Sequence, residues 1–201
     1  MHQKNINMSD KTIKIKGTNT GKVKIGQNEK EGFTALLTIT ASGKKLKPII
    51  IGKGKTKRCL KKYDLNNDVV STFSNNGWTN CGILKLALEQ IYMYTKGKDA
   101  VLLLDSFPAH KDKFISNEAQ KLNIQLIFVP EGLTYKYQPL DVSINGIIKQ
   151  KSKKKWKTEV TKNSDLKITS KDAVIHFMNA FKNIKCQTVK KSFYISCFNH
   201  D

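Results

Sequence analysis

Two runs of β-branched and apolar residues stand close together in the first quarter of the chain. They cover 33–40 and 46–51, and a turn that contains Gly43 separates them. Such a pair of runs around a glycine-containing turn is typical of a β-hairpin. Residues 1–27 are polar and rich in Lys, Asn and Gly, so we expect a loosely ordered arm there, with at most one edge strand near 22–25.

The middle of the chain predicts parallel strands. Residues 100–104 and 124–129 form two nearly continuous apolar runs, as in strands that are covered on both faces. A helical pattern over about 113–122 lies between them, and strand–helix–strand order implies parallel pairing. A short strand near 69–73 and a helix with apolar positions from 83 to 92 precede this unit. The predicted fold class is therefore α/β.

Helical patterns fill the last third of the chain. A helix-like stretch covers 142–156, and an amphipathic helix covers about 170–182. We accordingly expect an α/β core over 28–157, followed by a helical C-terminal tail over 158–201.

The positive charge of the chain comes almost wholly from lysine. The formal net charge is +20, and Arg58 is the single arginine. Lysine attracts phosphate without reading sequence, whereas base-specific contacts are made most often by arginine, so the charge favours DNA binding along the phosphate backbone. An A+T-rich coding sequence would give the same lysine-rich composition without any nucleic-acid partner. No apolar run is long enough to cross a membrane.

Lysines are concentrated in the stretch 149–157. This run could contact phosphate or act as a nuclear-import signal, which would place the protein in the nucleus; a solvated helix face is the structural alternative. The candidates for DNA contact are Lys149, Lys151, Lys153, Lys154 and Lys155. Trp78 and Trp156 could stack on bases, although anchoring a core or an interface is the commoner role of tryptophan.

Two aspartates occupy positions suited to chemistry. Asp105 follows the apolar run 100–104, and Asp141 precedes a helix after the next strand. Carboxylates brought together in this way can hold Mg²⁺ or Mn²⁺ for phosphoryl transfer, because hard cations prefer oxygen ligands. The structural alternatives are a loop-capping and a helix-capping aspartate. His110 could support such a metal site from behind or cap the local backbone.

Three motifs occur in order along the chain. They are Leu-Leu-Leu-Asp105-Ser-Phe-Pro-Ala-His110, Ile-Phe-Val-Pro130 and Tyr-Gln-Pro-Leu-Asp141. Together they resemble the DDE superfamily endonuclease domain of pogo, Tigger and jerky-type transposases, and the resemblance covers roughly residues 16–156. It implies an RNase H-like mixed sheet flanked by helices, with Mg²⁺- or Mn²⁺-dependent cutting and joining of DNA ends. It also implies a triad of metal-holding aspartates, with Asp105 second and Asp141 third.

The chain departs from this family at the first aspartate. The family carries it in an Asn-Met-Asp-Glu-Thr segment on the first, central strand, which residues 7–10, Asn-Met-Ser-Asp, resemble superficially. The short spacing from Asp10 to Gly17 matches the family's linker instead, so Asp10 is the weaker alternative for the first ligand. We therefore expect the first central strand to be missing or replaced. Ser106 and Glu131 stand where the family usually has Asn and Pro.

Two functions remain on these grounds. The first is a metal-dependent DNA endonuclease or strand transferase that uses Asp105 and Asp141. The second is a transposase-derived fragment, domesticated or decaying, that only binds DNA. The number of acids separates the two, and the chain supplies two of the three. The sequence leaves open whether copies of the chain associate with one another.

Overall fold

The computed structural model describes residues 4–14, 32–62, 68–162 and 169–198. The strands are β1 Lys4–Lys14, β2 Gly32–Thr40, β3 Ile49–Lys53, β4 Val70–Ser74, β5 Ala100–Asp105 and β6 Ile124–Val129. The α-helices are α1 Cys81–Thr95, α2 Lys113–Lys121, α3 Thr134–Tyr137, α4 Asn145–Lys162, α5 Ser170–Lys182 and α6 Cys186–Phe198. Three short segments complete the chain path: the 3₁₀ turns η1 Lys57–Lys62 and η3 Pro108–Lys111, and the π-helical turn η4 Leu140–Ile144.

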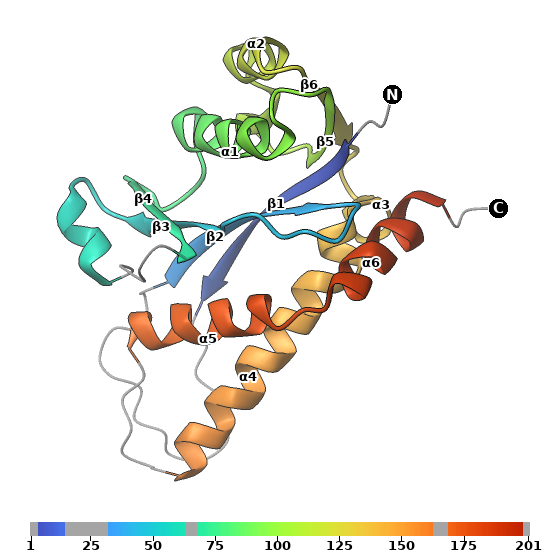
Figure 1. Ribbon diagram of the computed structural model, residues 1–201. Coiled ribbons are helices and arrows are strands. Elements are labelled where there is room, and N and C mark those ends of the chain that lie inside the picture. Colours follow the sequence, from blue (N-terminus) through green and yellow to red (C-terminus); the bar gives the residue numbers. More distant parts are fainter. Residues whose placement is uncertain (1–3, 15–31, 63–67, 163–168, 199–201) are drawn as a thin grey trace.

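The strands form one six-stranded mixed sheet in the order β4-β3-β2-β1-β5-β6 (Figure 1). The predicted hairpin is confirmed as the antiparallel pair β2 and β3, and the predicted parallel pair is confirmed as β5 and β6. The short strand expected near 69–73 is β4, which lies parallel to β3 at the edge of the sheet.

The centre of the sheet is occupied by β1, which the sequence had led us to expect as missing or replaced. β1 pairs antiparallel with β2 from Ile6↔Thr40 to Lys14↔Gly32, and parallel with β5 from Lys4↔Ala100 to Asn7↔Leu103. The prediction of a loosely ordered arm is therefore corrected for residues 4–14, because their backbone groups pair on both sides of the strand. The edge strand expected near 22–25 lies outside the described residues.

Helices α1 and α2 cover one face of the sheet (Figure 1). Leu84 and Leu88 of α1 share a buried cluster with Leu36 of β2 and with Leu102 and Leu104 of β5. Every second residue of β5 is buried, as the pleat of a strand requires when one face is more deeply covered than the other.

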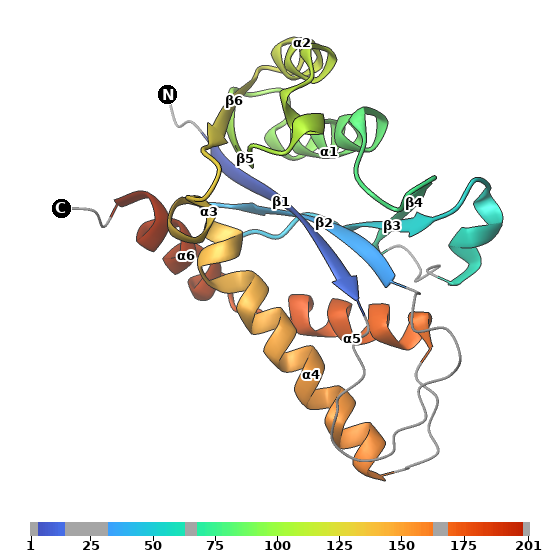
Figure 2. The same ribbon diagram turned by 180° about the vertical axis from the view of Figure 1, so that it is seen from behind.

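Helices α4, α5 and α6 cover the opposite face (Figure 2). Phe33 of β2 meets Phe177 of α5 edge to face at 5.7 Å between ring centroids, and Ile148 of α4 and Phe193 of α6 lie in the same cluster. The expected tail is therefore part of the core, and the boundary drawn after residue 157 falls inside α4. None of the helices in the described ranges is both long and apolar enough to span a membrane.

Lys45, in the β2–β3 turn, fastens the end of α5 to the sheet. Its Nζ donates to the carbonyl oxygens of Phe181, Lys182 and Ile184 at 2.8, 2.6 and 2.7 Å. Burial lowers the pKa of Lys45, and the charge of Lys151 on α4 lowers it further. The carbonyl end of a helix carries partial negative charge, so a cation placed there stabilises the packing of α5.

Replacing Lys45 with Met should lower the free energy of unfolding by about 1–3 kcal/mol, because three carbonyl oxygens lose a charged donor. Urea denaturation followed by circular dichroism measures this loss. Lys44→Met is the matched control, since Lys44 is exposed, and it should change stability by less than about 0.5 kcal/mol. Equal losses in the two variants would contradict the role given to Lys45.

Candidate functional site

The C-terminal ends of β5 and β6 meet at one edge of the sheet. Asp105 is the last residue of β5 and pairs with Val129, the last residue of β6. The Ser106 hydroxyl donates to the carbonyl oxygen of Val129 at 2.7 Å and ties the two strand ends together. Sheets with parallel strands collect their binding groups at this end, so the edge beside Asp105 is the candidate site.

The loop after β5 holds the Asp105 carboxylate. His110 Nδ1 lies 2.7 Å from Asp105 Oδ1 and 3.2 Å from the backbone oxygen of Asp105. The Phe107 N–H donates to the same carboxylate oxygen at 3.3 Å. Pro108 opens the 3₁₀ turn η3, which brings the fully buried His110 back to the strand end. His110 therefore contacts both the carboxylate and the local backbone.

Asp141 lies in η4, the turn between α3 and α4. It lies within the π-helical turn rather than at a helix N-cap, which corrects the expected capping position. Asn145 Nδ2 donates to Asp141 Oδ1 at 2.8 Å, one turn along the chain. η4 contacts the central strand β1. Single π turns are frequent at functional sites, because the extra residue re-aims the side chains of that turn.

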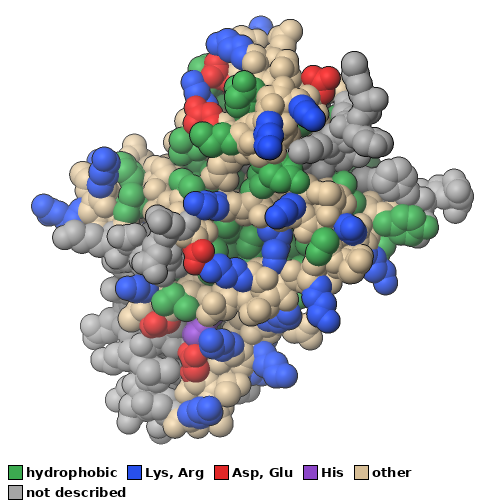
Figure 3. Space-filling view, in the orientation of Figure 1, with side chains coloured by type: hydrophobic (Ala, Val, Ile, Leu, Met, Phe, Trp, Pro, Cys, Tyr) green, Lys and Arg blue, Asp and Glu red, His purple; other side chains and the backbone are tan. Residues whose placement is uncertain are grey.

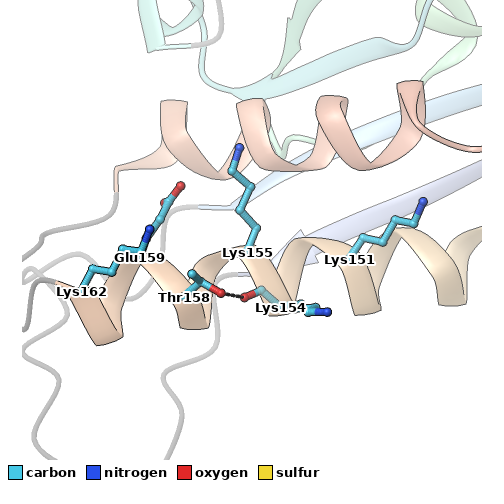
Figure 4. A pocket seen from close by; sticks show the side chains of 6 residues that line it. All are labelled: Lys151, Lys154, Lys155, Thr158, Glu159 and Lys162. Carbon is cyan, nitrogen blue, oxygen red and sulfur yellow. Dashed lines mark hydrogen bonds between the residues drawn. The ribbon is translucent and has the colours of Figure 1, made fainter.

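The lysines of α4 form a separate feature. The five candidates for DNA contact, from Lys149 to Lys155, are all exposed. An open hollow of about 380 Å³ lies along this helix. We call the residues that line it the α4 lysine surface. The hollow is lined by Lys151, Lys154, Lys155, Thr158, Glu159 and Lys162 (Figure 4). Lys162 was not among the predicted DNA contacts, although it lies two turns beyond Lys155 on the same helix.

The acid in this surface is held from α5. Glu159 Oε2 lies 2.7 Å from His176 Nε2, and His176 is buried. Figure 4 shows Glu159 and Lys155 pointing toward α5. Lysine and arginine side chains are also spread over the face of the molecule seen in Figure 3, with few acidic side chains among them.

A model of the DDE superfamily endonuclease family matches residues 30–198. The chain belongs to this family. Two curated relatives are the human and mouse proteins described as "Pogo transposable element with KRAB domain", which are 28% and 27% identical over 137 residues. These residues are 66% of this chain and 22% of each relative, so the match spans about a fifth of the relatives' length.

Solved structures of a mariner transposase show the same fold. The catalytic domain of Mos1 mariner transposase superposes with a TM-score of 0.57 at 10% identity, over 96% of this chain and 76% of that one. The Mos1 Strand Transfer Complex also gives 0.57 at 10% identity, over 96% and 51% of the two chains. The fold is therefore the RNase H-like mixed sheet that the family resemblance implied.

The described residues of this DDE domain do not make a complete metal site. Among them, no three His, Cys, Asp or Glu side chains are grouped so as to hold one metal ion. The Oδ1 atoms of Asp105 and Asp141 already accept hydrogen bonds from the protein. Two-metal chemistry needs carboxylates that converge on the ions.

The register of β1 places Ser9 level with Asp105. Asn7 is level with Leu103 of β5, so Ser9 is level with Asp105, two residues further along both strands. Ser9 also pairs with Leu37 of β2, whereas Asp10 pairs with Leu36.

An aromatic pair beside Asp105 was missed as a unit by the sequence analysis. The rings of Trp78 and Phe107 are stacked, with centroids 6.3 Å apart and planes 15° from parallel. Phe107 in turn meets the His110 ring edge to face at 5.6 Å. Trp78 was not linked to Phe107 in the sequence, because the two residues are 29 positions apart and give no local signal of their contact.

Replacing His110 with Leu should lower the free energy of unfolding by about 1–3 kcal/mol, because Asp105 loses a partner at a largely buried position. His110→Asn is the matched control, since an Asn amide can donate from near the position of Nδ1 and should retain part of this stability. Urea denaturation measures both variants. Equal stability of the Leu variant and the natural chain would contradict the role given to the His110–Asp105 contact.

Proposed function

We propose that this chain is a transposase-derived DDE domain that binds DNA through its phosphates and does not cut it. The α4 lysine surface is the observation that carries the proposal. It gathers Lys151, Lys154, Lys155 and Lys162 along one exposed helix of a chain whose net charge is +20. The surface contains one acid, Glu159, whose carboxylate lies 2.7 Å from His176, so the four lysines outnumber the acid.

The chemistry of lysine sets the kind of recognition. A lysine ammonium group is a point charge that contacts phosphate oxygens, so it contributes affinity without distinguishing bases. Counterions released from the DNA make such binding strongly dependent on salt. The exposed lysine run of α4 also supports placing the protein in the nucleus, where a DNA partner would be met.

The carboxylates support binding without cleavage. Asp105 is held by His110, Asp141 is held by Asn145, and Ser9 occupies the β1 position that is level with Asp105. Mg²⁺ or Mn²⁺ binding by this chain is accordingly expected to be weak, because a hard divalent cation needs several oxygen ligands at once.

A metal-dependent endonuclease is the second candidate, and the presence of β1 favours it. The strand that carries the first acid in the family is in place, and Asp10 follows Ser9 on it. Structures of the Mos1 transposase catalytic domain with Raltegravir are described with Mg and with Mn. In this candidate, Asp105 and Asp141 hold the cations, Asp10 completes the set and His110 orients Asp105.

The DNA-binding proposal predicts a local loss on α4. The double variant Lys154→Gln, Lys155→Gln should weaken binding to duplex DNA about tenfold and reduce the slope of log K against log salt by about 2, since about one phosphate contact is lost with each lysine. Fluorescence anisotropy with two duplexes of unrelated sequence measures both quantities, and the two duplexes should behave alike.

The matched control for this variant is Lys98→Gln, Lys113→Gln. It removes the same charge from exposed positions that border α1 and α2, on the other face of the sheet. Its affinity for DNA should stay within about twofold of the natural chain. An equal loss of DNA affinity in the two double variants would contradict the role given to the α4 lysine surface. It would indicate instead that DNA binding is spread over the whole basic protein.

Plasmid nicking separates the two candidates. The natural chain should leave supercoiled plasmid intact with Mg²⁺ or Mn²⁺, whereas Ser9→Asp should bind Mn²⁺ more tightly in calorimetry and nick slowly, because a third carboxylate would stand level with Asp105. Ser9→Asn is the control, since it adds a side chain of the same size without charge. Adding Asp105→Asn to the Ser9→Asp variant should remove both gains.

Nicking by the natural chain would contradict the binding-only proposal if it is lost in each of the variants Asp10→Asn, Asp105→Asn and Asp141→Asn. That result would support the endonuclease. Nicking that survives all three substitutions would mark a contaminating nuclease and would leave no support for the second candidate.

A further inference from the structure

Trp78 is an exposed aromatic ring held on a rigid loop beside the candidate site. Its side chain is 47% exposed. The Trp78 N–H donates to Asn76 Oδ1 at 2.9 Å, and the Ser74 hydroxyl donates to the Trp78 carbonyl oxygen at 2.7 Å. Gly77 has a φ of +77°, and a Cβ there would lie 3.1 Å from Lys53 Cβ. The loop between β4 and α1 is thus fixed by contacts on both sides of Trp78.

One side of the Trp78 ring is covered, and the covering residues lead to Asp105. Phe107 stacks on Trp78, with the two planes 15° apart. The Phe107 N–H donates to Asp105 Oδ1, and its ring meets His110, the residue that holds Asp105. Trp78 is therefore the outermost of a row of rings that begins at the carboxylate.

The rings of Trp78 and Phe107 lie outside the two hydrophobic core clusters. Neither Trp78 nor Phe107 is among the described residues of the clusters under α1 and α2 or under α4, α5 and α6. Packing in these two clusters therefore does not account for a large ring in this position. A tryptophan that is rigid, half-exposed and backed by a second ring is preorganised for a flat partner, because little conformational entropy is lost when the partner binds.

Charge around the ring indicates which flat partner it would be. Lys53 is exposed and lies against Gly77, next to Trp78. The turn η1, which carries Lys57 and Arg58, contacts β3 and β4, the strands that border this loop. Cations beside an aromatic platform suit a nucleotide, because the base stacks on the ring while its phosphate meets the charge.

We propose that the exposed face of Trp78 stacks on an unpaired nucleobase of bound DNA, at the end of the sheet that carries Asp105. This inference rests on the DNA binding proposed above and adds a contact to a base, which the α4 lysine surface does not make. Stacking tolerates any base, so it agrees with a chain that has one arginine and little means of reading sequence. A fully paired duplex offers its bases to Trp78 only at its ends or where a base is flipped out.

The test uses the full chain with Trp156→Phe, which leaves Trp78 as its single tryptophan. Two DNA probes are compared. In the first, both ends of the duplex are closed by non-nucleotide linkers, so that no base is unpaired. The second is the same duplex with a single-stranded overhang. Anisotropy of labelled DNA reports binding, and Trp78 emission reports stacking in the same samples. We expect both DNAs to bind and the overhang to quench Trp78 strongly, with little quenching by the closed duplex.

Substitution of the ring gives a second readout. Trp78→Leu should weaken binding of the overhang DNA about 5- to 100-fold while the closed duplex binds as before, because stacking on one base is lost. Trp78→Phe should restore most of the difference between the two DNAs, since it keeps an aromatic face. Circular dichroism and urea denaturation establish that both variants are folded before their affinities are compared.

The outcomes separate this inference from the function on which it rests. DNA binding with unchanged Trp78 emission, or equal losses for the two DNAs in Trp78→Leu, overturns the stacking contact and leaves the phosphate-binding function standing. No binding of either DNA overturns both. A change in Trp78 emission that follows protein concentration without DNA would assign the ring to a contact between copies of the chain, and would also overturn the inference.

Discussion

Hydrogen bonding of β1 on both of its edges holds the two halves of the sheet together. Residues 6–14 pair with β2 of the antiparallel hairpin, and residues 4–7 pair with β5 of the parallel unit. Without β1, β2 and β5 would each present an unpaired edge in the middle of the protein, and unpaired backbone groups are costly when buried. The cluster under α1 and α2 spans this joint, since it contains both Leu36 of β2 and Leu102 of β5.

The same pairing decides which residues can act together at the candidate site. A parallel register fixes the level of each residue relative to its neighbour, so Asp105 is level with Ser9 and not with Asp10. A slip by one residue would bring Asp10 level with Asp105, but it would turn every side chain of β1 to the other face. Backbone pairing therefore limits which β1 position could carry the first metal-binding acid. It does so more tightly than a comparison of motifs along the chain.

The sequence predicts the elements with strong apolar patterns and misses those held by long-range contacts. The hairpin, the pair β5 and β6, and α5 were predicted because their apolar runs are long and bounded by clear breaks. β1 was not, because Lys4–Lys14 is mostly polar and is held by backbone pairing on both sides. α6 was missed because polar and apolar residues are mixed along it, and only packing against β2 and η4 shows its buried side.

The same distinction between local patterns and long-range contacts applies to the candidate site. The position of Asp105 at a strand end was predicted, whereas Asp141 was expected just before a helix and lies within the turn η4. The contacts that hold them were not predicted, because the aromatic stack of Trp78 and Phe107 and the hydrogen bond from Ser106 to β6 join residues far apart in the chain. Ser106 had been noted only as a departure from the family, yet its hydroxyl joins the ends of β5 and β6.

A DDE domain can keep its fold and its attraction for DNA when its acid set is incomplete, because the two depend on different charges. Carboxylates that converge without a cation repel one another, and this repulsion disfavours their charged forms. Here Asp105 is paired with His110 and Asp141 with Asn145, so each carboxylate is satisfied within the protein. The lysines of α4 project from another part of the molecule, and their potential does not require these acids. In the function proposed here, loss of one acid therefore ends the chemistry while it leaves the DNA-binding surface intact.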